Sequence, residues 1–116
     1  MWTINIKNQQ ACGDLMTAFF KKFPNHALQT QAFYLLECFQ DFKMPMSGPP
    51  GGWAGGIIYA LSNRYKRACG IPGLLNKQCE EFFGVSMSTI YKRSWMIRKM
   101  LDFEFIMPVL NPDLQD

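Results

Sequence analysis

The segment Trp53–Tyr65, WAGGIIYALSNRY, constrains the fold most, because it has too few polar residues to face water over much of its circumference. A helix that is apolar on nearly every side must be surrounded by other helices. Small residues in this segment let neighbouring backbones come close: Ala54, Gly55, Gly56 and Ala60. Each glycine costs about 1 kcal/mol relative to alanine in a helix interior, so we expect close packing to compensate. The segment predicts a buried central helix.

Helix-breaking residues mark both ends of this central helix. Pro49-Pro50-Gly51-Gly52 precedes it and predicts a turn into the helix, and Cys69-Gly70-Ile71-Pro72-Gly73 predicts a turn out of it. We interpret the glycines from Gly48 to Gly56 as turn and packing residues. This segment lacks the lysine and the serine or threonine that follow the glycines of a phosphate-binding loop.

Two further helices are predicted before the central one. Apolar residues recur at helical spacing from about Cys12 to Phe23, where Pro24 ends the helix, and again from about Leu28 to Phe42. Residues 1–11 have a short strand-like alternation with no partner strand, so we expect an arm packed on the domain.

The segment Leu74–Leu101 predicts a helix-turn-helix. Asn76 is expected to cap a short helix over about Lys77–Phe83, and Gly84 suits the left-handed position after that helix. Ser86 is expected to cap a second, longer and basic helix. A short helix, a turn with glycine and a longer helix form this motif.

The sequence therefore predicts an all-α protein: one domain over residues 1–116, with five helices and a helix-turn-helix formed by the last two. A chain of 116 residues is long enough for one core. An N-terminal arm (1–11) and an acidic, proline-containing C-terminal tail (102–116) flank the helices.

Charge is unevenly distributed along the chain. Residues 1–60 contain four Lys/Arg and three Asp/Glu, residues 61–101 contain eight and two, and residues 102–116 contain none and four. The net charge of these segments is thus +1, +6 and −4. A basic segment of this kind favours an anionic partner, although an ordinary solvated face gives the same composition.

In a helix-turn-helix the second helix can enter the major groove by its N-terminal end. The candidate nucleic-acid-binding residues are Ser86, Ser88, Thr89, Lys92, Arg93, Arg98 and Lys99. The cations would neutralise phosphates, and an arginine can also read guanine. We expect Arg64, Lys66 and Arg67 to extend the charge at the end of the central helix. Glu80 is unfavourable, because such motifs usually have a small residue four positions before the glycine, and it predicts a looser crossing.

The chain also resembles a known family. Ile58-Tyr59, Gly84-Val85-Ser86 and Thr89-Ile90 resemble the corresponding residues of the cyclin box in the core repeats of transcription factor IIB, over about residues 49–101. This resemblance implies a cyclin-like arrangement of the five helices in a single bundle. The same pattern is similar to a family of uncharacterised prokaryotic domains, for which no activity is implied. Transcription factor IIB has two repeats and a zinc ribbon, whereas this chain has room for one repeat and no cysteine pair for the ribbon.

Two functions follow as hypotheses: a DNA-binding, transcription-associated regulatory domain, or a cyclin-like adaptor that binds a protein partner. For the adaptor, Tyr91 and Trp95 are candidate contact residues, since they cannot both face inward together with Ile90 and Ile97. We predict no enzymatic activity and no cofactor, because His26, the single histidine, has no cysteine or serine nearby in sequence.

Metal and disulfides are not expected either. The four cysteines are far apart and include no C-x-x-C pair, so we interpret them as reduced structural thiols. No apolar run reaches the ~18 residues of a membrane span, and residues 1–10 lack the features of a signal peptide. We therefore expect a cytoplasmic protein that does not bind membranes.

Overall fold

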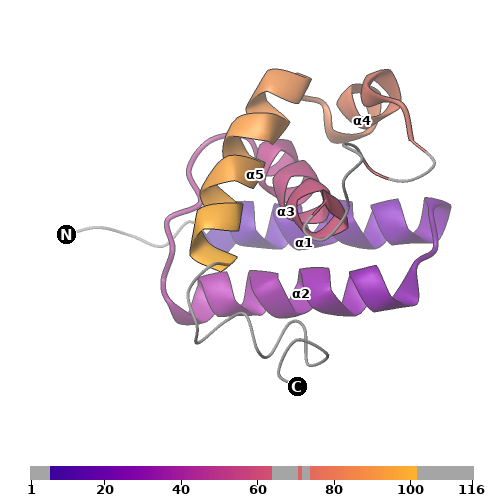
Figure 1. The fold of residues 1–116 in the computed structure, drawn as a ribbon. Helices are drawn as coiled ribbons and strands as arrows, with labels where there is room; N and C mark the ends of the chain where they lie inside the picture. The colour runs from indigo at the N-terminus through magenta and orange to yellow at the C-terminus, as the bar shows by residue number, and fades with distance from the viewer. Residues whose placement is uncertain (1–5, 64–70, 72–73, 102–116) are drawn as a thin grey trace.

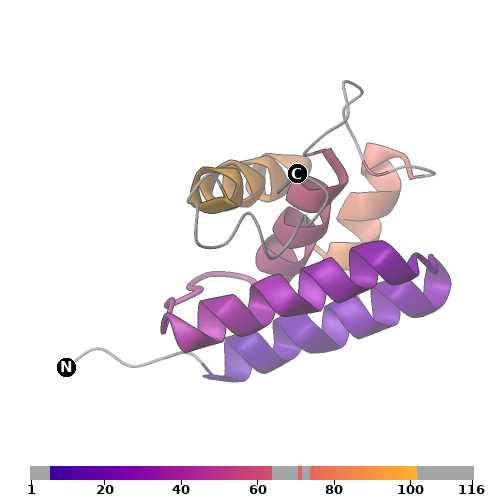
Figure 2. The same cartoon turned by 60° about the horizontal axis from the view of Figure 1, so that its bottom comes forward.

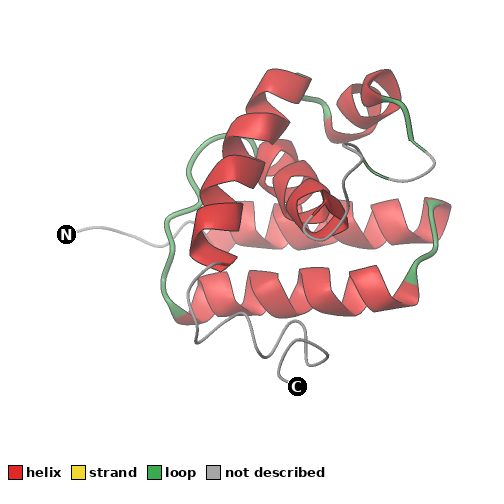
Figure 3. Ribbon diagram, in the orientation of Figure 1, coloured by secondary structure: helices red, strands yellow, loops and turns green. Residues whose placement is uncertain are grey.

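A computed structural model describes residues 6–63, 71 and 74–101, and every regular element in these ranges is an α-helix (Figure 3). In chain order the helices are α1 (Ile6–Lys22), α2 (His26–Asp41), α3 (Pro50–Asn63), α4 (Asn76–Phe83) and α5 (Met87–Leu101). The predicted all-α class and the five predicted helices are confirmed. The predicted tail, residues 1–5 of the arm, and Arg64, Lys66 and Arg67 lie outside the described residues.

α3 is the centre of the arrangement. α1 and α2 run antiparallel to each other as one layer, α3 crosses this layer, and α5 lies against α3 (Figure 1). The view turned by 60° shows the pair α1–α2 on one side of α3 and α5 on the other (Figure 2). Because α3 contacts all four other helices, the fold is built around it.

The predicted all-round burial of α3 is confirmed. Every residue from Gly51 to Ser62 is buried, and Ile57 and Ile58 are fully so. The helix begins at Pro50, so Gly51 and Gly52 belong to its first turn and not to a preceding turn as predicted. Proline is well suited to the first position of a helix. Gly51 is required by packing: a Cβ atom there would lie 1.9 Å from the carbonyl oxygen of Phe83.

α1 begins six residues before the predicted start, so residues 6–11 are helical and not part of an arm. The reason lies in tertiary contacts of polar side chains. The Asn8 amide donates to the backbone oxygens of Met46 (2.8 Å) and Gly48, and the buried Gln9 amide donates to that of Met44 (3.4 Å). These bonds hold the α2–α3 loop against α1.

α2 also begins earlier than predicted, at His26. The side chain of Asn25 accepts a hydrogen bond from the backbone N–H of Leu28 (3.1 Å), as an N-cap residue does. His26 is therefore the first residue of a helix, where it is exposed.

The core is rich in phenylalanine and contains buried thiols. The ring of Phe19 stacks on that of Phe83 with centroids 5.5 Å apart, which joins α1 to α4. Cys12, Cys38 and Cys79 are free and buried, and Cys69 lies outside the described residues. Burial raises the pKa of Cys12 to about 12, so this thiol stays neutral near pH 7.

Candidate nucleic-acid interface

The link between α4 and α5 consists of Gly84, Val85 and Ser86. Gly84 has a φ of 70°, in the left-handed region, and its N–H donates to the carbonyl oxygen of Glu80 (2.9 Å). This is the predicted helix end. Ser86 caps α5 as predicted, because its Oγ accepts the backbone N–H of Thr89 (3.3 Å).

The predicted cap of α4 is wrong. The N-cap residue is Leu75, whose N–H donates to Oε1 of Gln78 (2.8 Å). A glutamine at the third helical position can reach back in this way, so the helix begins one residue earlier. The Asn76 amide instead donates to the hydroxyl of Tyr91 (3.0 Å), and it thereby links α4 to α5.

Glu80 has a role that its position in the motif did not predict. Its Oε2 accepts the backbone N–H of Met87, the first residue of α5, at 2.7 Å. A carboxylate at a helix N-terminus is stabilised by the helix dipole. Glu80 thus fastens α4 to the start of α5, while the main packing partner of α5 is α3.

α5 has two faces. Its inner face buries Met87, Ile90, Ser94 and Ile97. The exposed residues form a continuous stripe on the opposite side, which we name the outer face: Ser88, Tyr91, Lys92, Trp95, Arg98 and Lys99. Spacings of three and four residues place side chains next to one another on a helix. Four predicted site residues are therefore brought together here: Ser88, Lys92, Arg98 and Lys99.

The outer face is basic and aromatic. Three of its six residues are cations and none is acidic. Trp95 is 59% exposed and Tyr91 is 42% exposed. The Nζ atom of Lys99 lies 3.9 Å from the centroid of the Trp95 ring. Tyr91 is held more firmly, since its ring packs edge-on against Tyr59 with centroids 5.3 Å apart.

Arg93 does not belong to the outer face. Its Nη2 donates to the carbonyl oxygen of Ser47 (3.0 Å), and its Cζ lies 4.7 Å from the centroid of the Trp53 ring. The Nε atom is buried without a hydrogen-bond partner among the described residues. The small size of Gly56 admits this side chain, because a Cβ there would lie 2.7 Å from Cβ of Arg93. Arg93, predicted as a nucleic-acid contact, is thus engaged by Ser47 and Trp53 and is not brought together with the other predicted cations.

The two other predicted residues lie at the start of α5. Thr89 is half-buried, and a Cβ atom at Gly52 would lie only 2.8 Å from its methyl group. The hydroxyls of Ser86 and Thr89 lie 3.3 Å apart, within hydrogen-bond distance. These residues shape the N-terminus of α5, and Ser86 is exposed beside it.

Tyr91 and Trp95 were not among the predicted nucleic-acid contacts. They were predicted only as candidate contacts of a protein partner, with one of them exposed, whereas both are exposed. Tyr91 and Trp95 are four residues apart, so they lie next to each other on the helix, on the side away from the buried Ile90 and Ile97. This spacing was the signal in the sequence that could have placed both on the outer face.

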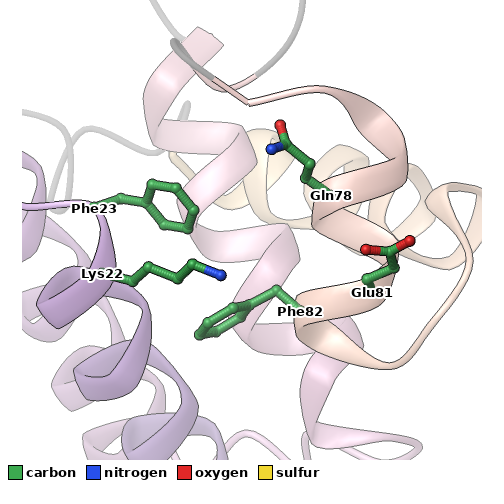
Figure 4. A pocket seen from close by; sticks show the side chains of 5 residues that line it. All are labelled: Lys22, Phe23, Gln78, Glu81 and Phe82. Atoms are coloured by element: carbon green, nitrogen blue, oxygen red, sulfur yellow. The ribbon is translucent and has the colours of Figure 1, made fainter.

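A hollow of about 350 Å³ lies elsewhere, between the end of α1 and α4 (Figure 4). It is lined by Lys22, Phe23, Gln78, Glu81 and Phe82. None of the predicted site residues belongs to it. Across the described ranges, no group of three His, Cys, Asp or Glu side chains is arranged to hold a metal ion. In the same ranges, no helix combines the length and the apolarity needed to cross a membrane.

Neither the protein-family models, nor the curated proteins, nor the solved structures include a match to this chain. The resemblance to transcription factor IIB core repeats therefore stays a prediction.

Proposed function

We propose that the chain is a nucleic-acid-binding domain with a regulatory, transcription-associated role, and that the outer face of α5 is its binding surface. One observation carries the proposal: Lys92, Arg98 and Lys99 lie on one exposed stripe that contains no acidic residue and surrounds an exposed tryptophan. Such a surface is complementary to a polyanion with flat bases.

The physical basis is the release of counterions. Each phosphate neutralised by a lysine or arginine releases part of the condensed cation atmosphere, so the affinity falls as salt is added. Three contacts predict a slope of log K against log salt between about −2 and −3. This is a modest slope, in keeping with a net charge of +3.

The test is a salt series of binding, measured by fluorescence anisotropy with labelled single-stranded DNA, duplex DNA and RNA. Lys92→Ala and Lys99→Ala should each weaken binding and reduce the slope by about one unit. Lys21→Ala is the matched control, because it removes an exposed lysine from α1, away from the outer face. No salt-dependent binding of any of the three probes near 50 mM salt would refute the proposal.

The adaptor hypothesis would then take its place. It is favoured by the exposed apolar area of Leu75 (72% exposed), Tyr91 and Trp95. Exposed aromatic residues are frequent anchors in protein interfaces. Binding of this kind would depend on Trp95 and little on Lys92.

A further inference from the structure

We infer that the outer face of α5 binds single-stranded nucleic acid in preference to duplex, with an unpaired base stacked on the indole of Trp95. This inference rests on the proposed function and adds the form of the ligand.

The first observation is the position of Trp95. It lies in the middle of the outer face, three residues after Lys92 and three and four residues before Arg98 and Lys99. A flat apolar ring that remains 59% exposed offers a base the surface on which to stack. Stacking of one base on an aromatic side chain contributes about 1–3 kcal/mol. Bases in a duplex are already stacked on each other, so only an unpaired base can use this ring.

The second observation is the position of Lys99. Its Nζ is 3.9 Å from the centroid of the Trp95 ring. A phosphate-binding charge therefore lies over one face of the ring, and it must move off that face before a base can stack there. At an exposed site a cation–π contact contributes only about 0.5–1 kcal/mol, so the ammonium can turn to a phosphate at low cost.

The third observation is the N-terminus of α5, which a duplex reader would insert into the major groove. The hydroxyls of Ser86 and Thr89 face each other there. The first cation of α5 is Lys92, and the next residue, Arg93, donates to Ser47 instead of pointing outward. Arginine is the usual reader of guanine in the groove. The N-terminus of α5 thus lacks an arginine for reading bases, and the accessible charge lies further along the helix.

The experiment compares two fluorescein-labelled probes at 50 mM salt: a 15-nucleotide oligothymidine and a 15-base-pair duplex. The wild-type chain should bind the single strand at least about tenfold more tightly. Trp95→Leu should weaken single-strand binding by roughly 5- to 100-fold, while Trp95→Phe retains most of it. Tyr34→Leu is the control, since it removes an exposed aromatic ring from α2.

The outcomes separate the inference from the proposed function. Salt-dependent binding that is equal or tighter for the duplex, or that Trp95→Leu leaves unchanged, would overturn the inference and leave the proposed function standing. Absence of salt-dependent binding to either probe would overturn the inference, and its absence with the RNA probe as well would overturn the proposed function. The comparison of the two probes with wild-type protein needs no variant, so it remains decisive if Trp95→Leu fails to fold.

Discussion

α3 and α5 pack against each other, yet they differ in how much of their surface is exposed to solvent. α3 has no charged residue between Pro50 and Asn63, and its neighbours cover it from Gly51 to Ser62. α5 has four cations and is covered on one face only. Apolar residues on all sides define a helix that others must surround, whereas two-sided patterning leaves a surface free for a partner.

The difference also determines what a charge on α5 does. Lys92 and Arg93 are neighbours in sequence, but about 100° of helical rotation separates them. Lys92 is exposed on the outer face, while Arg93 reaches the Ser47 carbonyl beside α3. Two adjacent cations therefore have different roles, one available for binding and one structural.

The largest loss of stability is expected at Gly51, where α3 packs too closely on Phe83 to admit a Cβ atom. Gly51→Ala places a Cβ atom against the backbone carbonyl of Phe83, which cannot move aside without shifting α4. We expect a loss of about 3 kcal/mol in the free energy of unfolding, measured by chemical denaturation followed by circular dichroism. Gly13→Ala is the matched control, because its Cβ would meet Leu36 at an ordinary 3.4 Å. That control should be neutral or stabilising by up to about 1 kcal/mol. Equal stability of the two variants would contradict the packing described for α3.

The next largest effect on stability distinguishes Arg93 from Lys92. Arg93→Ala removes the bond to Ser47 and the contact with Trp53, and it should lower the free energy of unfolding by about 1–2 kcal/mol. Arg93→Lys should recover only part of this loss, since lysine lacks the planar group that stacks on an aromatic ring. Lys92→Ala should change stability by less than about 0.5 kcal/mol and act on nucleic-acid binding instead. Thermal and chemical unfolding of the three variants provide the measurement. If Lys92→Ala is the more destabilising, the assignment of roles is wrong.

The smallest effect concerns the start of α5. Glu80→Gln keeps an acceptor for the Met87 N–H but removes the negative charge at the helix N-terminus. We expect a loss of about 0.3–1 kcal/mol. Glu81→Gln is the control because Glu81 is exposed on the same helix, and it should be near neutral. Unfolding at low ionic strength gives the best sensitivity, and a larger loss for Glu81→Gln would contradict the assignment.

The parts of the fold that could be predicted are those that depend on residues close together in the chain. The burial of α3 followed from its composition, and the turn at Gly84 and Ser86 followed from backbone preferences. The start of α1 did not, because Asn8 and Gln9 are ordinary polar residues until the α2–α3 loop supplies carbonyl partners.

The candidate site had the same limitation: contacts between residues far apart in sequence could not be predicted. Lys92 was predicted from the helix-turn-helix motif, and Arg98 and Lys99 from the positive charge that continues along the same helix; all three are exposed on α5. The contact of Arg93 with Ser47 was not predicted, because the two residues are 46 positions apart in sequence. Glycine after proline at Pro50-Gly51 is typical of a turn, and only the close approach of Phe83 shows why glycine is required in this helix.

Because other helices cover α3 on every side, part of its surface stays exposed during synthesis until α5 has been translated. α3 is translated before α5, and residues 64–86 separate the two helices. At about 5–20 residues per second, the side of α3 that α5 later covers is exposed for a time on the order of seconds. Within that interval the side of α3 that includes Gly52, Gly55, Gly56 and Tyr59 is exposed on the nascent chain, and docking of α5 ends this exposure.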